Sequence, residues 1–599
     1  MTLIISRTEA TLLIVQLIVI TIAGLSLWYK IFLPTTYYLM ISALAVILSL
    51  QMIKNHRISF FIFSLVLSIV FMRNVYYLAT NYAIIPFGDG NWDYGVVKTF
   101  AGEGHAFVIT EQNYPATLLT WYSGWPILHI LALCLSQVSG INAYQVALLL
   151  PSIIGTCSLV FVYLLVDKIR KSLRLASEVT GFALLLYSVS PEALFWTVQF
   201  VRQNLGILFL VITFYLVYKS WIEPKELKYT ALTIFFALTL VMVHHFTSFI
   251  LVLYFLLFSV FLVLGTHFAK RKFGNKLFGE PPNVSKHAIF GLGLISLVFL
   301  FTWWNNYGTT VWPTITSGIV RFVKILTGAQ EIEYLPSPAS YPEILTPTWV
   351  TAMSFLRDIF IYVPALLGLV ILTMKVGKTP GKLFVVYSTL SLGLLFIIDN
   401  LFFRQEVYRV ITLALPFVSL LGAVSYSYIK NKLKRIRYIP VISIIVVFLL
   451  FYSFIGLWGH GFAPLHLYDP SISYGQVGER NTDFMRFGNF NEKVITNNSS
   501  VLWADDLNPM LFLINSSNYD KIRRLSQLDT AGAQEVGSYG KEIIYELKGF
   551  NLYFYYARGF SPYKNPGNAS VVAGQFELQV QSEFSCVYND GKYRLWMNP

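Results

Sequence analysis

The sequence predicts an all-α polytopic membrane bundle of about 13 transmembrane helices, followed by a small C-terminal α/β domain. Hydrophobic residues make up 55% of the chain and charged residues 13%, whereas soluble domains carry about 25% charged residues. Apolar runs of about 20 residues, the length that crosses the hydrocarbon core, recur from Thr11 to Trp458. After about Gly459 the composition changes to polar turn residues and short alternating runs. We therefore divide the chain into a transmembrane domain, 1–458, and a soluble domain, 459–599.

The expected spans follow from these runs. The first run is followed directly by a second and has no small-residue cleavage site behind it, so it is interpreted as a retained span and not a signal peptide. A turn from His244 to Ser248 separates two spans, because without it the basic stretch Lys270–Lys272 would fall on the wrong side of the membrane. The predicted spans are residues 11–32, 36–53, 58–79, 144–166, 176–191, 203–220, 229–244, 249–267, 287–306, 356–374, 383–401, 410–429 and 438–458.

The distribution of basic residues predicts the orientation. Half of the 44 Lys and Arg residues lie in alternate loops between spans, and such loops are cytoplasmic in plasma-membrane proteins. This distribution also argues that the net charge of +13 does not serve nucleic-acid binding. We expect a multi-pass plasma-membrane protein with a cytoplasmic N-terminus and an extracytoplasmic C-terminal domain. The basic loops are 54–57, 167–174, 219–228, 268–287, 375–382 and 430–437.

Polar residues gather at the outer ends of the spans, while the span interiors are almost free of charge. A transporter would carry ionisable groups along a path through the spans, and a nucleotide-driven one would need a Gly-rich phosphate loop, which the sequence lacks. The three cysteines are scattered and suggest neither disulfides nor a metal site. The chemistry is therefore expected at the outer membrane surface. The residues concerned are Asp89, Asp93, Glu192, Arg202, His244, His245, Asp358, Asp399, Arg404, Glu406 and Arg409.

The first large outer loop, residues 80–143, is too long and too patterned to be a plain connector. An acidic residue, Asp89, comes just after a span, the aromatic Tyr94 follows it, and Gly104 closes a helix-like stretch. A Tyr114-Pro115 segment then leads into aromatic and apolar residues that predict amphipathic helices at the interface, before a span opens near Pro151. This arrangement resembles the first outer loop of the GT-C superfamily of membrane glycosyltransferases. That group includes protein O-mannosyltransferases, aminoarabinose transferases and oligosaccharyltransferases.

The resemblance covers roughly Ile58 to Phe417 and implies an inverting transfer of a sugar from a polyprenyl-phosphate donor to an extracytoplasmic acceptor. Asp89 matches the family's loop aspartate, which would take the proton of an acceptor hydroxyl as it attacks the anomeric carbon. The stretch Arg404–Arg409 resembles the basic start of a late span in the family. Arg409 is the candidate for stabilising the leaving phosphate, because a guanidinium binds phosphate in a fork.

Other candidates have two interpretations each. Asp93 is a second catalytic carboxylate or a helix N-cap. Glu192, in Ser190-Pro191-Glu192, lies where oligosaccharyltransferases hold metal-binding acids, or it pairs with Arg202. His244 and His245 bind a metal or substrate phosphate, or they form a hydrogen-bonded interfacial turn.

Arg202 and Arg404 complete the predicted set of phosphate-binding and substrate-binding residues. The need for a divalent cation, Mg²⁺ or Mn²⁺, is left open, since some members of the superfamily use one and others do not. Its candidate ligands are Asp89, Glu192 and His244. Glu331 and Glu333 lie in a later outer loop without the family's surrounding motif, and solvation is their simplest interpretation.

The acceptor is expected to be a lipid-linked glycan or a protein, and membrane lipids are the other expected partners. Asn91–Gly95 echoes the Trp-Trp-Asp-Tyr-Gly signature of oligosaccharyltransferases, but theirs lies in the C-terminal domain, and the tail here has no such motif. Transfer of a single sugar is therefore favoured over transfer of an oligosaccharide to asparagine. The alternatives are a lipid or polysaccharide transporter or flippase, and a non-enzymatic membrane scaffold.

Overall fold

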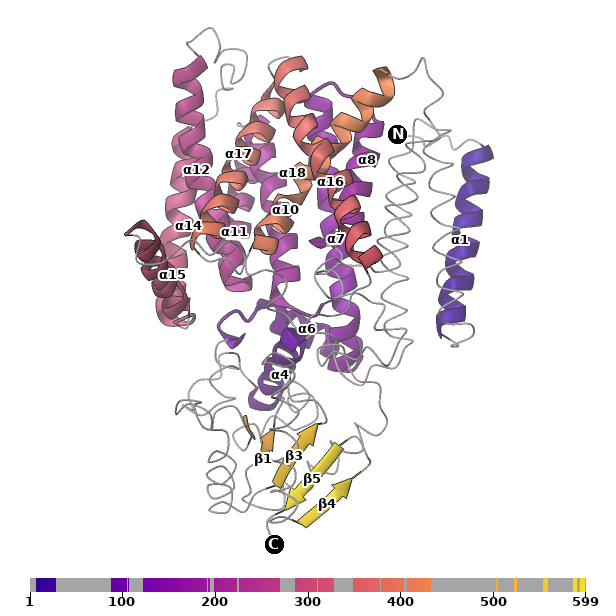
Figure 1. Cartoon of the computed structure of the whole chain (residues 1–599), viewed down its shortest axis with the longest axis vertical. Coiled ribbons are helices and arrows are strands. Elements are labelled where there is room, and N and C mark those ends of the chain that lie inside the picture. Colours follow the sequence, from indigo (N-terminus) through magenta and orange to yellow (C-terminus); the bar gives the residue numbers. More distant parts are fainter. Residues whose placement is uncertain are drawn as a thin grey trace.

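The computed structural model is a helical bundle with a strand-containing tail (Figure 1). It describes residues 7–28, 88–104, 106, 122–190, 192–193, 196, 199–222, 226–269, 286–309, 311–327, 348–376, 379–402 and 407–432, and in the tail 502–504, 522–524, 553–557, 585–589 and 593–597.

The described helices are α1 (Arg7–Trp28), α4 (Gly88–Glu103), α6 (Ile127–Ser139), α7 (Ala143–Ser172), α8 (Glu178–Val189), α10 (Arg202–Ile222), α11 (Leu227–Val243), α12 (His245–Ala269), α14 (Lys286–Asn306), α15 (Val311–Leu326), α16 (Thr348–Lys375), α17 (Pro380–Phe402) and α18 (Val407–Lys432). Within the described ranges, 7 helices are long and apolar enough to cross a membrane. They are α7, α10, α12, α14, α16, α17 and α18. Helices α8 and α11 are apolar but shorter, and in α1 the apolar run is shorter still.

Each of these ten helices coincides with a predicted span to within a few residues, except that α16 begins eight residues before its predicted start. The turn predicted at His244 is confirmed, since α11 ends at Val243 and α12 begins at His245. The predicted spans 36–53, 58–79 and 438–458 lie outside the described residues, so the total of about 13 stays a prediction.

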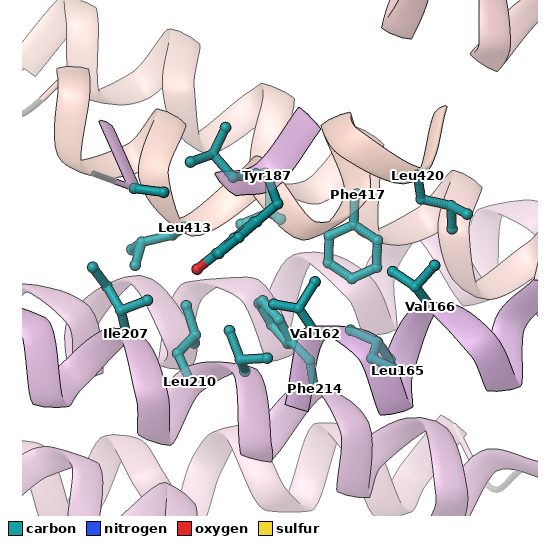
Figure 2. Packing of buried hydrophobic residues seen from close by; sticks show 14 of the residues in the cluster. Val162, Leu165, Val166, Tyr187, Ile207, Leu210, Phe214, Leu413, Phe417 and Leu420 are labelled. Atoms are coloured by element: carbon teal, nitrogen blue, oxygen red, sulfur yellow. The ribbon is translucent and has the colours of Figure 1, made fainter. Parts of the chain in front are cut away.

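Figure 2 shows the centre of the bundle, where α7, α8, α10 and α18 meet. Phe214 of α10 is fully buried and its ring lies 5.3 Å from that of Phe417 of α18. Helices α16 and α18 approach closely at Gly368, where a Cβ atom would stand 1.8 Å from the Leu421 carbonyl oxygen. In a lipid environment, such van der Waals packing and small-residue contacts drive helix association.

Contacts between helix ends show where the predicted cytoplasmic loops lie. Lys430, near the end of α18, forms an ion pair with Glu178 at the start of α8. The backbone N–H of Gly381 in α17 donates to Ser172 Oγ at the end of α7 at 3.0 Å. Three of the predicted cytoplasmic loops therefore meet at one end. We call the opposite end, which carries α4 and α6, the outer end; the tail strands lie beyond it (Figure 1).

The described part of the tail is a five-stranded mixed sheet in the order β2-β1-β3-β5-β4. Its strands are β1 (Leu502–Ala504), β2 (Ile522–Arg524), β3 (Tyr553–Ala557), β4 (Ser585–Asn589) and β5 (Tyr593–Met597). Strand β1 is parallel to β2 and β3, and β5 is antiparallel to β3 and β4. Any helices of the predicted α/β domain lie outside the described residues.

Candidate active site

The first element of the outer end is a buried cluster around Asp93. His129 of α6 donates from Nε2 to Asp93 Oδ1 at 2.8 Å. Arg202 Nε lies 2.8 Å from the same oxygen, but its N–H does not point at it, so this contact is an ion pair without a hydrogen bond. The backbone N–H of Arg202, the first residue of α10, donates to Asp93 Oδ2 at 3.4 Å. The carboxylate therefore fastens α4 to α6 and to the N-terminus of α10, where a negative charge is stabilising.

All three side chains of this cluster are buried, and Asp93 is 1% exposed. Burial lowers the pKa of His129, although its hydrogen bond to Asp93 works in the opposite direction. The histidine is therefore neutral at pH 7, with its proton on Nε2. The N-cap interpretation of Asp93 is wrong, because α4 begins at Gly88 and Asp93 lies more than one turn inside it.

Aromatic rings enclose the guanidinium of Arg202. Its Cζ atom lies 4.2 Å from the centre of the Tyr122 ring and 5.4 Å from that of Trp125, and Nη1 donates to the Tyr122 carbonyl at 3.3 Å. Trp303 of α14 holds this turn by donating from Nε1 to the Gly124 carbonyl at 2.9 Å. The expected pairing of Arg202 with Glu192 is therefore replaced by a pairing with Asp93 and the aromatic rings.

The two histidines lie at the junction of α11 and α12, next to this turn. The ring of His245 is 4.7 Å from that of Trp125 and 4.6 Å from that of His244. His244 Nδ1 accepts from the Thr247 backbone N–H at 3.2 Å and lies 2.9 Å from Thr247 Oγ1. Burial, followed by the nearby His245, Arg409 and Arg202, lowers the pKa of His244 well below its ordinary value.

Arg409, in the first turn of α18, lies near the start of α12. Its Cζ atom is 5.8 Å from the centre of the Trp196 ring and 5.9 Å from that of Phe246, the second residue of α12. Trp196 is fixed in turn, because its Nε1–H donates to Thr412 Oγ1 at 3.1 Å. The structure therefore brings Arg202, Arg409 and the histidine pair to one region.

Glu192 is buried beside α16. Its Oε2 accepts from Ser190 Oγ at 2.6 Å and its Oε1 from the Tyr362 hydroxyl at 3.1 Å. The described part of the chain contains no group of three or more His, Cys, Asp or Glu residues that is arranged to hold a metal ion. Because Glu192 and His244 each commit atoms to protein partners, we derive no step through a metal, and the predicted Mg²⁺ or Mn²⁺ stays a prediction.

For several predicted site residues, the side chain or the whole residue lies outside the part of the chain that the structure describes. Asp89 lies in the first turn of α4, one turn before Asp93, but its side chain is not described. Arg404, Glu331 and Glu333 lie outside the described residues altogether.

Sequence reasoning missed the roles of three residues. The apolar helix α6 contains no Asp, Glu, Lys or Arg, and His129 is its one histidine, which is the signal that marks it as a buried partner of a charge. Tyr122 and Trp125 stood out only as members of an aromatic-rich loop, and no spacing rule joins them to Arg202, 77 or more residues away. Only the folded loop brings them together.

Comparison with known proteins adds the fold class. No protein-family model matches the sequence, and no curated protein matches it. Two solved structures resemble the fold. The apo oligosaccharyltransferase of Archaeoglobus fulgidus is 13% identical at a TM-score of 0.51, covering 90% of this chain and 74% of its own. ArnT from Cupriavidus metallidurans bound to undecaprenyl phosphate is 10% identical at a TM-score of 0.51, covering 90% and 97%.

Both structures are GT-C proteins, so the chain has the fold of GT-C membrane glycosyltransferases. At these sequence identities the likeness shows the fold alone.

Proposed function

We propose that the chain is a membrane glycosyltransferase that moves a sugar from a polyprenyl-phosphate donor to an extracytoplasmic acceptor with inversion. The observation that carries the proposal is the gathering of Arg202, Arg409 and the His244-His245 pair at one end of a GT-C fold, beside the helix that carries Asp89. The bound undecaprenyl phosphate of the Cupriavidus ArnT, a lipid phosphate, fits this use of the fold.

The chemistry assigns one task to each group. The acceptor oxygen attacks the anomeric carbon as the bond from that carbon to the donor phosphate breaks. The proton of the acceptor hydroxyl passes to the Asp89 carboxylate, which acts as general base. The leaving polyprenyl phosphate gains negative charge, and the Arg409 guanidinium stabilises it in a region where protein excludes much of the water. Attack from the face opposite the phosphate inverts the sugar carbon.

Asp93 has a positioning task in this scheme. Its two oxygens are engaged by His129 and Arg202 in a buried cluster, which leaves it a poor proton acceptor for a substrate. It holds α4 against α6 and α10 and so sets the location of the helix turn that carries Asp89.

The acceptor is proposed to enter from the outer end, between the first outer loop and the tail. A lipid-linked glycan or a protein fits this route, with transfer of a single sugar. The N-terminus is proposed to be cytoplasmic and the tail extracytoplasmic, because the basic loop ends meet at the end opposite to α4 and α6.

The test is a transfer assay with the purified chain in lipid nanodiscs and a radiolabelled polyprenyl-phosphate sugar. Asp89→Asn should abolish transfer while the thermal unfolding profile stays that of the unchanged chain. The matched control is Glu226→Gln, which removes a surface carboxylate near the start of α11, at the opposite end, and should leave transfer unchanged. Full transfer by Asp89→Asn would sink the assignment. Movement of the lipid across the membrane without bond formation would favour the transporter alternative.

A further inference from the structure

Helix α15 begins at the outer end of the bundle, directly after the span α14, and lies at the edge of the bundle (Figure 1). α14 ends at Asn306, and Trp303 near its end donates to the Gly124 carbonyl in the turn before α6. The Val311 N–H donates to the Gly308 carbonyl at 3.1 Å, so only a tight turn separates α14 from α15. Tryptophan residues at the ends of spans are typical of the headgroup level. We therefore place the start of α15 at the depth of the lipid headgroups.

One face of α15 is apolar from Trp312 to Val323, but the bundle covers only its first half. Trp312 and Ile315 pack against the aromatic end of α14, where the Trp312 ring stacks on that of Phe301 at 5.7 Å. Ile319 and Val323 continue the same face at helical spacing, and they are 52% and 50% exposed. The second half of the apolar face therefore extends beyond the bundle.

The other face of α15 is basic. Lys324 is exposed and, five residues after Ile319, lies on the opposite side of the helix. The helix also contains Arg321 and no acidic residue. Helices with an apolar face and Lys or Arg on the polar face lie in the plane of the membrane interface, with the apolar face among the acyl chains. Anionic headgroups complement the charge of such a helix.

We propose that α15 lies flat on the outer leaflet and binds anionic phospholipids, with Ile319 and Val323 among the acyl chains and Lys324 at the headgroup phosphates. A second copy of the chain fits this surface less well, because pairing two α15 helices brings basic residues together without an acidic partner in either helix. The inference does not depend on the transfer reaction, since it concerns a surface at the edge of the bundle.

The first measurement locates the helix relative to the bilayer. The full chain, with its three native cysteines replaced by alanine and its melting temperature checked, carries a spin label at Val323→Cys or at Lys324→Cys. It is reconstituted in nanodiscs of equal parts phosphatidylcholine and phosphatidylglycerol. We expect oxygen, which concentrates among the acyl chains, to relax the label at 323 more strongly, and a water-soluble nickel complex to relax the label at 324 more strongly. Equal exposure of both labels to nickel would overturn the proposal.

The second measurement tests the charge of the lipid. A fluorophore on Val323→Cys is quenched by phosphatidylglycerol or phosphatidylcholine that carries a nitroxide on its acyl chain. Each basic residue near an anionic surface strengthens binding by roughly fivefold. Phosphatidylglycerol should therefore quench at a several-fold lower mole fraction than phosphatidylcholine.

Substitution of both basic residues, Arg321→Gln with Lys324→Gln, should abolish this preference. The matched control is Lys375→Gln, which removes an exposed basic residue at the opposite end of the bundle and should leave the preference unchanged. Equal quenching by the two lipids before substitution would overturn the proposal, and so would a preference that survives the loss of both basic residues.

Discussion

Replacing Asp93 with asparagine removes the carboxylate that holds three helices together at the outer end. The substitution keeps the size of the side chain but deletes its charge, so the Arg202 guanidinium is left buried without its counter-ion, and one of the contacts to His129 and to the Arg202 N–H is lost. Breaking a buried charge pair on one side costs about 3–5 kcal/mol. The ratio of unfolded to folded chains should therefore rise by a factor of roughly 10² to 10⁴.

The measurement is the free energy of unfolding in bicelles by steric trapping, alongside the transfer assay. A double-mutant cycle with Arg202→Gln gives the coupling free energy between Asp93 and Arg202. The double variant should lose less unfolding free energy than the two single variants lose together. We expect Asp93→Asn to lose stability and, through displacement of α4, transfer activity. Unchanged stability with abolished transfer would refute this reasoning and support the alternative in which Asp93 itself exchanges a proton with the substrate.

Two further outcomes follow from the fold. The pKa of His129 in the folded chain lies below its ordinary value of about 6.5. Below pH 6.5 the unfolded chain therefore binds a proton at this histidine that the folded chain does not. As the pH decreases through this range, the free energy of unfolding should fall by at most about 1.4 kcal/mol per pH unit. Between pH 5 and 8, the melting temperature of His129→Gln should change less with pH than that of the unchanged chain. An identical pH dependence in the two proteins would contradict its assignment to His129. Gly368→Ala should destabilise the bundle by about 1–3 kcal/mol because its methyl group overlaps the Leu421 carbonyl; equal unfolding free energies would contradict that packing.

Much of the bundle was predictable because a membrane imposes simple rules on sequence. Apolar runs of spanning length located ten of the described helices, and the charge argument placed the break at His244 although the hydropathy there is continuous. Helix α15 was not predicted, because it lies in an outer loop where no run of spanning length marks it. The tail strands are short. Residues 576–587, one of the short alternating runs of the tail sequence, overlap β4 only at their end.

The sequence predicted which residues belong to the site but not which of them contact one another. Charges at span ends identified Arg202, Arg409 and Glu192, since ionisable groups are rare in such a chain and gather where they function. Their partners come from loops and helices far apart in sequence, as with Trp196 and Thr412. The pairing of Arg202 with Asp93 depends on how the first outer loop folds over α10, and the sequence pattern contains no distance information of that kind.

The most direct test of the account is a density map of the full chain in nanodiscs with a polyprenyl-phosphate sugar bound. The account predicts the phosphate within hydrogen-bonding distance of Arg409 and the anomeric carbon facing Asp89. A lipid bound elsewhere, with the Asp89 carboxylate turned to bulk water and no phosphate near Arg409, would contradict it.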